Sequence, residues 1–244
     1  MDLLQNKSEV SFDPEKHRYI TDDGKELLPV TRFLSFFTND FDPDNSILNR
    51  CSAREGIPPE VLKKRWEEKG RKSREIGHKF HENIEHYINT GKIRKNKFTN
   101  LVREFSKIKF QGKLYSELIV HDSNIGLSGT IDIAELIDDK ILQIKDFKVV
   151  EKPITDYSFG QKMKPPLEYL WDSKLSRYSL QISIYLYLLS EKFNLQIGPD
   201  NCLFWVNLKK QNITKIPVKY MKEEVINMIS YYMASKSNIE WEFD

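Results

Sequence analysis

The chain of 244 residues lacks several features that define large classes of protein. Its two cysteines, Cys51 and Cys202, are too few for a disulfide framework, a four-cysteine zinc site or an iron–sulfur cluster. We therefore expect two free thiols in a reducing compartment. The most apolar stretch, residues 182–189, is too short to cross a bilayer, and the N-terminal residues show no signal-peptide pattern. These absences predict a cytoplasmic protein that does not enter a membrane.

The chain also lacks a strong excess of one charge. Lys and Arg total 38 against 36 Asp and Glu, a formal net charge of +2. This balance excludes a uniformly basic nucleic-acid coat, but it is compatible with a basic groove around an acidic centre. Apolar residues make up 39% of the chain and the mean hydropathy is −0.55, which supports a hydrophobic core and excludes a wholly disordered chain.

The order of the predicted elements favours an α/β fold around a mixed sheet. Residues 10–19 and 27–30 are expected to form a hairpin, followed by a short helix that Thr31 caps and that ends near Phe37. Residues 40–59 are rich in turn-forming residues and are expected to form a loop or lid. Beyond them we expect helices over residues 60–89, 98–110, 175–193 and 222–234, and strands over residues 115–121, 127–137, 140–150, 203–208 and 213–218.

Two aspartates and a lysine occupy the predicted hairpin of residues 127–150. A turn centred on Asp139 places Asp132 and Asp146 opposite each other, with Cβ atoms about 5 Å apart. Lys148 lies on the same strand face as Asp146. Two close carboxylates repel unless one is protonated or a cation lies between them, and oxygen ligands suit Mg²⁺ or Mn²⁺. The alternative is a surface hairpin in which Asp132 and Lys148 form a solvated ion pair.

Histidines recur along the long helix predicted over residues 60–89. His78, His81, Glu82 and Glu85 follow the spacing of one helix face. The separation of His81 and His86 does not match the H-E-x-x-H zinc motif. We expect His78, Glu82 and His86 to be solvated, and His81 to be a candidate metal ligand beside the two aspartates.

Two further segments carry polar side chains in suggestive positions. Gln181 lies within an apolar run, on a helix face with Tyr178 and Tyr185, and a polar group there needs partners. It either caps a neighbouring carbonyl or lines a site with Tyr185. Near the start of the long helix, a basic segment with one aromatic residue could follow a phosphate backbone, or it could simply be a solvated helix face. The candidate nucleic-acid-binding residues of this segment are Lys63, Lys64, Arg65, Trp66, Arg71 and Lys72.

Four short motifs occur in a fixed order: Gly77-x-x-x-His81-x-x-x-Glu85, Gly129-x-x-Asp132, Asp146-x-Lys148 and Gln181-x-x-x-Tyr185. Together they resemble the motifs of the PD-(D/E)XK nuclease superfamily, in its RecB-like exonuclease branch. The segment of residues 17–34 also resembles the N-terminal hairpin and helix of phage-encoded members. Val149 stands where the family usually has Thr or Ser, and two cysteines cannot supply the iron–sulfur cluster of some relatives. The resemblance is therefore to the cluster-free members.

The resemblance implies a restriction-endonuclease-like core, an α/β fold with a central mixed sheet flanked by helices. One domain would span residues 1–244, with a hairpin, helix and loop at about residues 1–59 covering the core. Mg²⁺ or Mn²⁺ would be held by His81, Asp132, Asp146 and the carbonyl of Phe147. Lys148 would position and activate the attacking water. The remaining candidates are Gln181 and Tyr185, which would shape the site, and Glu117 and Glu85 as possible additional members.

The predicted function is that of a metal-dependent DNA nuclease, an exonuclease acting on single strands or free ends. Such an enzyme would serve phage, repair or recombination metabolism in a bacterial or phage-infected cell. One alternative is a nucleic-acid-binding module that keeps the fold without the chemistry. Another is a metalloenzyme that acts on small molecules.

Overall fold

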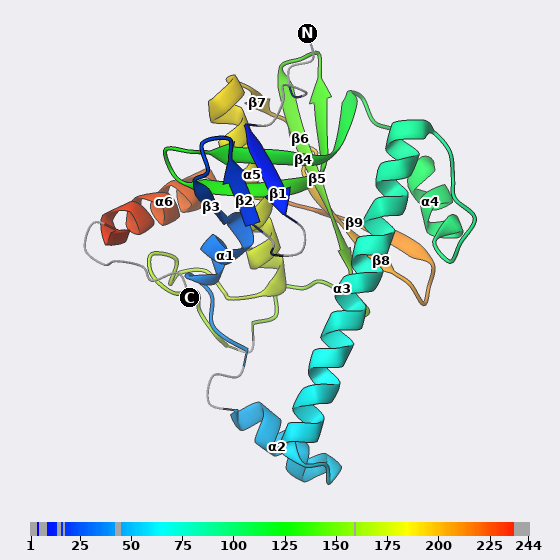
Figure 1. The fold of residues 1–244 in the computed structure, drawn as a ribbon, viewed down its shortest axis with the longest axis vertical. Helices are drawn as coiled ribbons and strands as arrows, with labels where there is room; N and C mark the ends of the chain where they lie inside the picture. The colour runs from blue at the N-terminus through cyan, green and yellow to red at the C-terminus, as the bar shows by residue number, and fades with distance from the viewer. Residues whose placement is uncertain are drawn as a thin grey trace.

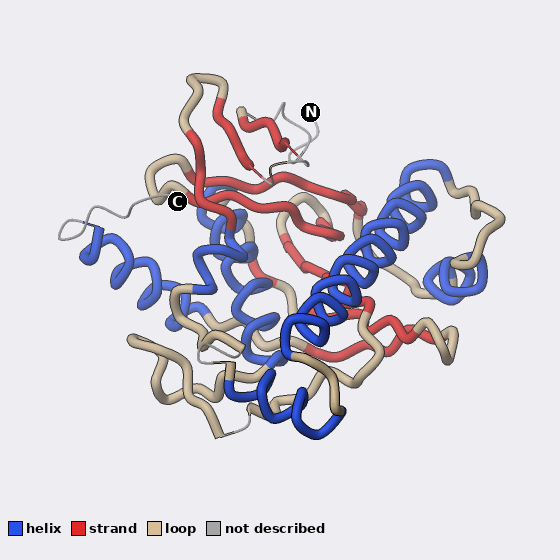
Figure 2. Tube along the Cα trace, turned by 60° about the horizontal axis from the view of Figure 1, so that its bottom comes forward, coloured by secondary structure: helices blue, strands red, loops and turns tan. Residues whose placement is uncertain are grey.

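The structure is a computed structural model, which describes residues 4, 9–13, 16, 18–41, 45–158 and 160–236. In this part of the chain a mixed sheet of nine strands has helices on both of its faces (Figures 1 and 2). The predicted α/β class, with a central mixed sheet flanked by helices, is confirmed. None of the helices in the described ranges is both long enough and apolar enough to span a membrane.

The elements follow one another in an order close to the predicted one. The N-terminal region contributes β1 Val10–Asp13, β2 Arg18–Thr21, β3 Glu26–Pro29, α1 Val30–Ser35 and α2 Ser46–Glu55. The central region contributes α3 Pro59–Thr90, α4 Thr99–Ser106, β4 Lys113–Asp122, β5 Leu127–Ile137 and β6 Ile141–Val149. The C-terminal region contributes α5 Lys174–Phe193, β7 Gln196–Ile197, β8 Cys202–Asn207, β9 Asn212–Pro217 and α6 Lys222–Lys236.

Strand β5 lies at the junction of the sheet. It pairs with β4 along nearly its whole length, in antiparallel orientation. On its other side, β5 pairs with β6 only from Ile133 onward, and its first residues pair with β3 in parallel orientation. Strand β6 pairs in parallel with β8 from Lys145 onward. The β5–β6 ladder therefore ends at the Ile133–Lys145 pair, and beyond it the two strands follow different neighbours.

Two hydrophobic cores fix the helices to the sheet. On one face, α3 and α4 pack against β6 and β8 through a cluster of rings in which Phe80, Phe105 and Phe204 surround Phe147. On the other face, α1, α5 and α6 cover β4, β5 and β6 with mostly aliphatic side chains. Each large apolar side chain that is fully buried contributes about 1.5–3 kcal/mol. The two cores thereby hold α3 and α5 on opposite faces of β6.

Helix α3 is held to the core by its C-terminal half only. It begins at Pro59, whose missing N–H is no loss in the first turn, and ends at Gly91, whose φ of 67° favours glycine, as predicted. In the C-terminal half, Phe80 and Ile84 are buried against the sheet, whereas Leu62 is the buried residue of the N-terminal half. The N-terminal half runs past the end of the sheet toward α2 (Figure 1).

The prediction for residues 10–30 is wrong in two details. Residues 10–19 form two strands instead of one, and β1 pairs with β2 in antiparallel orientation. Residues 14, 15 and 17 lie outside the described part. Thr31 does not cap α1, because the helix already begins at Val30, after Pro29, without a side-chain cap. Proline has no N–H for β3 to use, so the strand ends there and the helix starts directly.

The predicted loop over residues 40–59 is also corrected, because residues 46–55 form helix α2. Residues 42–44 are outside the described part. Asn45 and Gly56, both in left-handed conformation with φ of 56° and 65°, flank the helix. The turn-forming residues at both ends of this segment therefore mark the boundaries of a helix instead of a continuous loop.

Smaller differences concern the ends of the other elements. Helix α4 stops at Ser106, earlier than predicted, and the N–H groups of Gln111 and Gly112 donate instead to the carboxylate of Glu135, at 2.6 and 3.0 Å. Helix α5 is capped by Ser173, whose hydroxyl accepts a hydrogen bond from the N–H of Ser176 at 3.0 Å. The two-residue strand β7 was not predicted.

Candidate metal centre

The candidate site lies where β5 and β6 separate. Asp132 and Asp146 are the first residues beyond the last pair of the ladder, Ile133 and Lys145. The predicted register is confirmed, because the observed pairs are those of a hairpin centred on Asp139. Since the β5–β6 ladder does not extend to Phe147, the main-chain N–H of this residue donates to Oδ2 of Asp132 at 2.6 Å. This bond fixes the Asp132 carboxylate in the opening between the strands.

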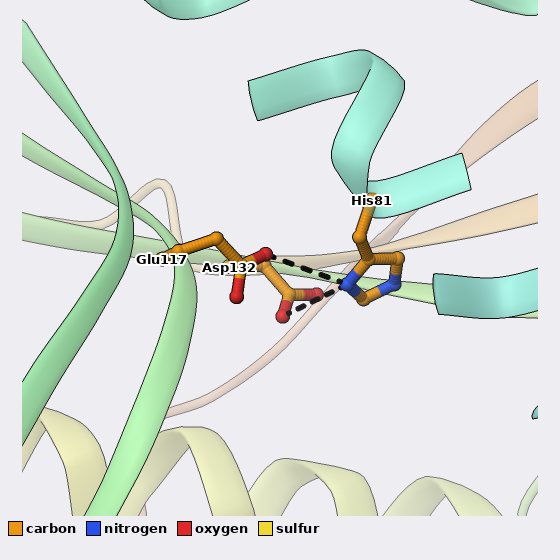
Figure 3. A group of neighbouring side chains, drawn as sticks. All are labelled: His81, Glu117 and Asp132. Carbon is orange, nitrogen blue, oxygen red and sulfur yellow. Dashed lines mark ion pairs between the residues drawn. The ribbon is translucent and has the colours of Figure 1, made fainter. Parts of the chain in front are cut away.

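Three side chains from three elements converge at this opening (Figure 3). His81 of α3 points its Nδ1 atom at Asp132 Oδ1, 3.4 Å away, and at Glu117 Oε1, 3.7 Å away. One donor atom from each of the three lies within 4.8 Å of the others. The side chains are 24%, 13% and 35% exposed for His81, Asp132 and Glu117, so the group is shielded but open to a small ligand.

Glu117 adopts an unusual backbone conformation inside β4. Its φ is 50°, in the left-handed region that residues other than glycine seldom adopt. The flanking pairs Ser116–Ile133 and Leu118–Ile131 are regular, whereas Glu117 does not pair with Asp132 across the ladder. Local strain of this kind costs about 1–3 kcal/mol and concentrates at functional sites. Here it accompanies the placement of the Glu117 carboxylate beside His81.

The charges of the three groups depend on one another. Burial alone would lower the pKa of His81, but the carboxylates of Asp132 and Glu117 raise it to about 10. Burial alone would raise the pKa of Asp132, but His81, Lys148 and the Phe147 N–H lower it below its usual value. Without a metal ion, the imidazolium of His81 therefore neutralises part of the acidic group at neutral pH.

Asp146 and Lys148 form a second, deeper pair. Lys148 Nζ lies 2.7 Å from Asp146 Oδ2, and the Asp146 side chain is only 4% exposed. The direction of approach is poor for a hydrogen bond, so this buried oxygen has no well-aligned donor among the described residues. Burial raises the pKa of Asp146 to about 6, with Lys148 acting against it and Asp132 adding to it. Burial lowers the pKa of Lys148, but the two aspartates outweigh it and raise the pKa, so its ammonium group keeps its charge.

Helix α5 extends this pair on the other face of the sheet. Lys148 Nζ donates to Gln181 Oε1 at 3.3 Å, and Gln181 Nε2 donates to the Tyr185 hydroxyl at 3.2 Å. The ring of Tyr178 lies below the ammonium group, 4.6 Å from Nζ to its centroid, a cation–π contact. These contacts hold Lys148 from two sides, so its ammonium group has a defined position. They favour the interpretation in which Gln181 and Tyr185 line a site.

A close contact joins two of the predicted motifs. A Cβ atom on Gly129 would lie 2.7 Å from Cε1 of Tyr185, so only glycine leaves room for this buried ring. Burial raises the pKa of Tyr185 far above its usual value, so its hydroxyl stays protonated. Gly129, Gln181 and Tyr185 also border a hollow of about 400 Å³ that reaches Glu117. The site is therefore open to solvent through this hollow.

The donor set fits a divalent ion that prefers oxygen ligands. Two carboxylates and one imidazole lie close enough to share one ion, and the Asp146 oxygen without a well-aligned donor lies nearby. Asp146 itself is outside the group of three, and its role as a ligand, like that of the Phe147 carbonyl, stays a prediction. An ion with a protonated lysine beside it can stabilise negative charge on a phosphate.

Other candidates are not members of the group of three. His78 is 74% exposed and pairs with Glu82 at 3.2 Å, and it borders the hollow that reaches Glu117. Glu85 is half-buried, and the described residues include no ion-pair partner for it. The predicted basic segment lies on the N-terminal half of α3, where Arg71 and Lys72 are paired with Glu68 at 2.9 and 3.3 Å.

The sequence indicated some parts of the site only weakly. Glu117 was a possible member without a defined role, and its one sequence signal is an acidic residue in the apolar strand around it. Tyr19 was not identified, although its hydroxyl lies 3.0 Å from Thr130 Oγ1 and ties β2 to β5 beside Asp132. Tyr178 was recognised on the Gln181 face, but its contact with Lys148 depends on how α5 packs on β6.

Comparisons with known proteins identify no family for this chain. No protein-family model matches the sequence, and no curated protein matches it significantly. Among solved structures, the chain is similar to the protein SSO0001, with 13% sequence identity, a TM-score of 0.37, and coverage of 86% of this chain and 76% of that one. It is also similar to a protein from Eubacterium rectale provisionally described as an exonuclease, with 12% identity, a TM-score of 0.37, and coverage of 61% and 57%. Similarity at this level leaves the function to be argued from the site.

Proposed function

We propose that this protein is a metal-dependent nuclease that hydrolyses phosphodiester bonds in DNA. One observation carries the proposal: His81, Glu117 and Asp132 offer three ligand atoms within 4.8 Å of one another, directly beside the buried pair of Asp146 and Lys148. A divalent ion held by these groups, Mg²⁺ or Mn²⁺, supplies positive charge and Lewis acidity at the phosphate. Carboxylate ligands with an adjacent ammonium group suit a phosphate ester, whose charge grows as the bond breaks.

Lys148 acts in this proposal as a hydrogen-bond donor. Because its pKa is raised, it is protonated at neutral pH and cannot take a proton from water. Its ammonium group, held by Asp146 and Gln181, donates to the attacking water or to a phosphate oxygen and so orients it. Asp146, with its pKa near 6, is the group of the pair that can exchange a proton close to neutral pH.

The finer assignment rests on the order of the sequence motifs. We assign the chain to the RecB-like branch of the PD-(D/E)XK nucleases, as a cluster-free exonuclease of phage, repair or recombination metabolism in the cytoplasm. The close contact between Gly129 and Tyr185 gives a physical reason for two of those motifs to occur together. A single domain over residues 1–244 is supported by the shared sheet, in which β3 of the N-terminal region pairs with β5.

The test is hydrolysis of end-labelled single-stranded and double-stranded DNA with Mg²⁺ or Mn²⁺. We expect cleavage by the wild type and a loss of about a thousandfold or more in His81→Ala, equivalent to about 4 kcal/mol of barrier. His86→Ala is the matched control, because His86 is a histidine of the same helix that belongs neither to the group of three nor to the hollow beside it. Closed circular DNA distinguishes the modes of attack, since an exonuclease leaves it intact.

Three outcomes would contradict the proposal. Equal activity in His81→Ala and His86→Ala would remove the metal centre from the reaction. Tight DNA binding without cleavage under any divalent metal would favour a binding module of the same fold. Turnover of a phosphate-free substrate would favour a metalloenzyme acting on small molecules.

A further inference from the structure

A second region with side chains suited to nucleic acid lies on the N-terminal half of α3, away from the candidate metal centre. A hollow of about 710 Å³ opens there between α3 and the segments that carry Phe41 and Lys152. Pockets of about 300–1,000 Å³ hold small-molecule-sized ligands, so one nucleobase fits. We call this hollow the α3 groove; besides Gly70, it is lined by Phe41, Trp66, Glu67, Lys69, Arg74 and Lys152.

Two aromatic rings stand at the α3 groove. Phe41 is 74% exposed, which is unusual for a phenylalanine. Its ring meets the half-buried ring of Trp66 edge-on, with centroids 6.1 Å apart. The flat face of an exposed ring is a surface on which any base can stack. The pair therefore offers a stacking platform independent of base sequence.

The cations of the α3 groove differ from those elsewhere on the helix. On the side away from Trp66, Arg71 is bound by Glu68 and Glu75, and Lys72 by Glu68. Lys69, Arg74 and Lys152 have no ion-pair partner among the described residues, and the nearby Glu151 is paired with Lys209. Three unpaired cations against Glu67 leave the groove positive and complementary to a phosphate backbone.

Two glycines lie on this face of α3. A Cβ atom on Gly70 would be in ordinary van der Waals contact with the guanidinium of Arg74, at 3.4 Å, so that side chain lies over Gly70. Gly77 faces open space, because a Cβ atom added there would have no neighbouring atom within 4 Å. Residues 66, 70, 74, 77 and 81 lie on one side of the helix at 3.6 residues per turn. Trp66 and His81 thus lie on the same side of α3, about 22 Å apart along the helix axis.

We propose that the α3 groove binds the single-stranded part of a DNA substrate, with a base stacked on Phe41 and Trp66 and phosphates held by Lys69, Arg74 and Lys152. The inference rests on the proposed nuclease function, for which it names the substrate class. Of the nucleic-acid-binding residues predicted from sequence it keeps Trp66 and replaces all the basic ones. The strand lies along α3 and leads to His81. A blunt duplex end offers no unstacked base to the aromatic pair, so the groove selects single strands and ends with overhangs.

The test measures binding of a labelled single-stranded oligonucleotide by fluorescence anisotropy, with a chelator present so that no hydrolysis occurs. We expect Phe41→Ala and Trp66→Ala each to weaken binding about tenfold, the typical effect of losing one stacking contact. Arg74→Gln should also reduce the slope of log affinity against log salt concentration by about 0.7, the value for one phosphate contact on a single strand. Arg71→Gln is the matched control, an arginine of the same helix held by Glu68 on another side.

The outcomes separate this inference from the proposed function. Wild-type binding and an unchanged salt slope in Phe41→Ala and Arg74→Gln would overturn the inference and leave the nuclease proposal standing. Loss of binding in these variants, with no cleavage by the wild type, would support the α3 groove as a DNA-binding site and contradict the proposed nuclease function. Since Phe41 and Arg74 are exposed, their variants test the groove even if Trp66→Ala does not fold. If Arg71→Gln loses as much affinity as Arg74→Gln, the effect is one of overall charge and contradicts a specific role of the groove. If the wild type binds a blunt duplex as tightly as a single strand, the single-strand selection is contradicted.

Discussion

The main-chain N–H of Phe147 and the carboxylate of Asp132 are joined by a hydrogen bond of 2.6 Å across the point where β5 and β6 part. The Phe147 ring, in contrast, is buried in the aromatic core beneath α3. The same residue thereby anchors β6 in the core and fixes the orientation of a candidate metal ligand.

The affinity for a divalent ion should rise with pH. A histidine binds a metal ion through its neutral imidazole. In the metal-free protein, however, His81 has a pKa of about 10 and its imidazole is protonated at neutral pH. Binding then releases about one proton, and the affinity rises by up to about tenfold per pH unit below the pKa of His81. Calorimetry in buffers of different ionisation enthalpy measures this release. His81→Asn should abolish it, and a pH-independent affinity in the wild type would contradict the assignment of His81.

Lys148→Met should separate chemistry from metal binding. Lys148 is not among the three grouped ligands, so the variant should still bind Mn²⁺ while losing hydrolysis by about a hundredfold or more. Removing the ammonium group also removes a charge that lowers the pKa of Asp146, so that pKa should rise further above 6. Electron paramagnetic resonance measures the binding of Mn²⁺, and a cleavage assay measures the loss of hydrolysis. Parallel loss of binding and cleavage would place Lys148 in metal retention.

Glu117→Gln should weaken metal binding more than Glu82→Gln. Both residues lie near a histidine, but Glu117 faces His81 within the group, whereas Glu82 pairs with the exposed His78. The loss of one carboxylate ligand should reduce affinity at least as much as loss of a supporting residue, about 10–100-fold. Calorimetric titration with Mn²⁺ measures the difference. Equal affinities in the two variants would remove Glu117 from the ligand set.

Gly129→Ala should destabilise the protein through a clash with Tyr185. The added methyl group would lie 2.7 Å from Cε1 of that ring, and overpacking of this kind costs about 1–3 kcal/mol. Urea unfolding measures the loss in free energy. Combining Gly129→Ala with Tyr185→Leu should cost less than the sum of the two single changes, because the smaller side chain relieves the clash. Strict additivity would show that the two residues are not in contact.

Glu135 and Lys145 form a buried ion pair whose contribution to the free energy of unfolding should depend on pH. Their side chains are 2% and 1% exposed, and Lys145, Gly112 and Gln111 lower the pKa of Glu135 against the opposing effect of burial. A carboxyl pKa lower in the folded state than its unfolded value near 4.5 stabilises the fold above about pH 4.5 and loses this contribution as the pH falls.

The variant that tests this pair is Glu135→Gln, which leaves the buried Lys145 without its counter-charge. We expect a loss of about 3–5 kcal/mol at neutral pH and a weaker dependence of unfolding free energy on pH below about 4.5. Chemical unfolding at several pH values measures both. Glu104→Gln is a control on an exposed pair with Lys107 and should change stability little.

Local parts of the site could be predicted because they depend on neighbouring residues. The turn after β5 has left-handed backbone at Asp138 and Asp139, with φ of 49° and 54°, and this turn sets the register of the β5–β6 ladder, which ends directly before Asp132 and Asp146. The strand period of two then places Lys148 with Asp146. The 3.6-residue period likewise puts Gln181 and Tyr185 on one face of α5.

Other parts could not be predicted, because they depend on contacts between distant segments. Glu117 enters the group through an irregular position in β4 that no local pattern marks. The basic residues of α3 look alike in sequence, but Glu68 pairs with Arg71 and Lys72 on one side, while Phe41, from a separate segment, meets Trp66 on another. Helix α2 was missed because turn-forming residues at both of its ends resemble those of a loop.

The sequence by itself determined most of the elements and the register of the central hairpin, because these follow from short-range backbone geometry. Only the tertiary structure decided which residues meet. Strands β5 and β6 diverge to different neighbours, and this opening lets His81 reach Asp132 from one face of the sheet while Gln181 holds Lys148 on the other. Packing of helices on both faces of the sheet sets these distances, and no single segment of the chain contains that information.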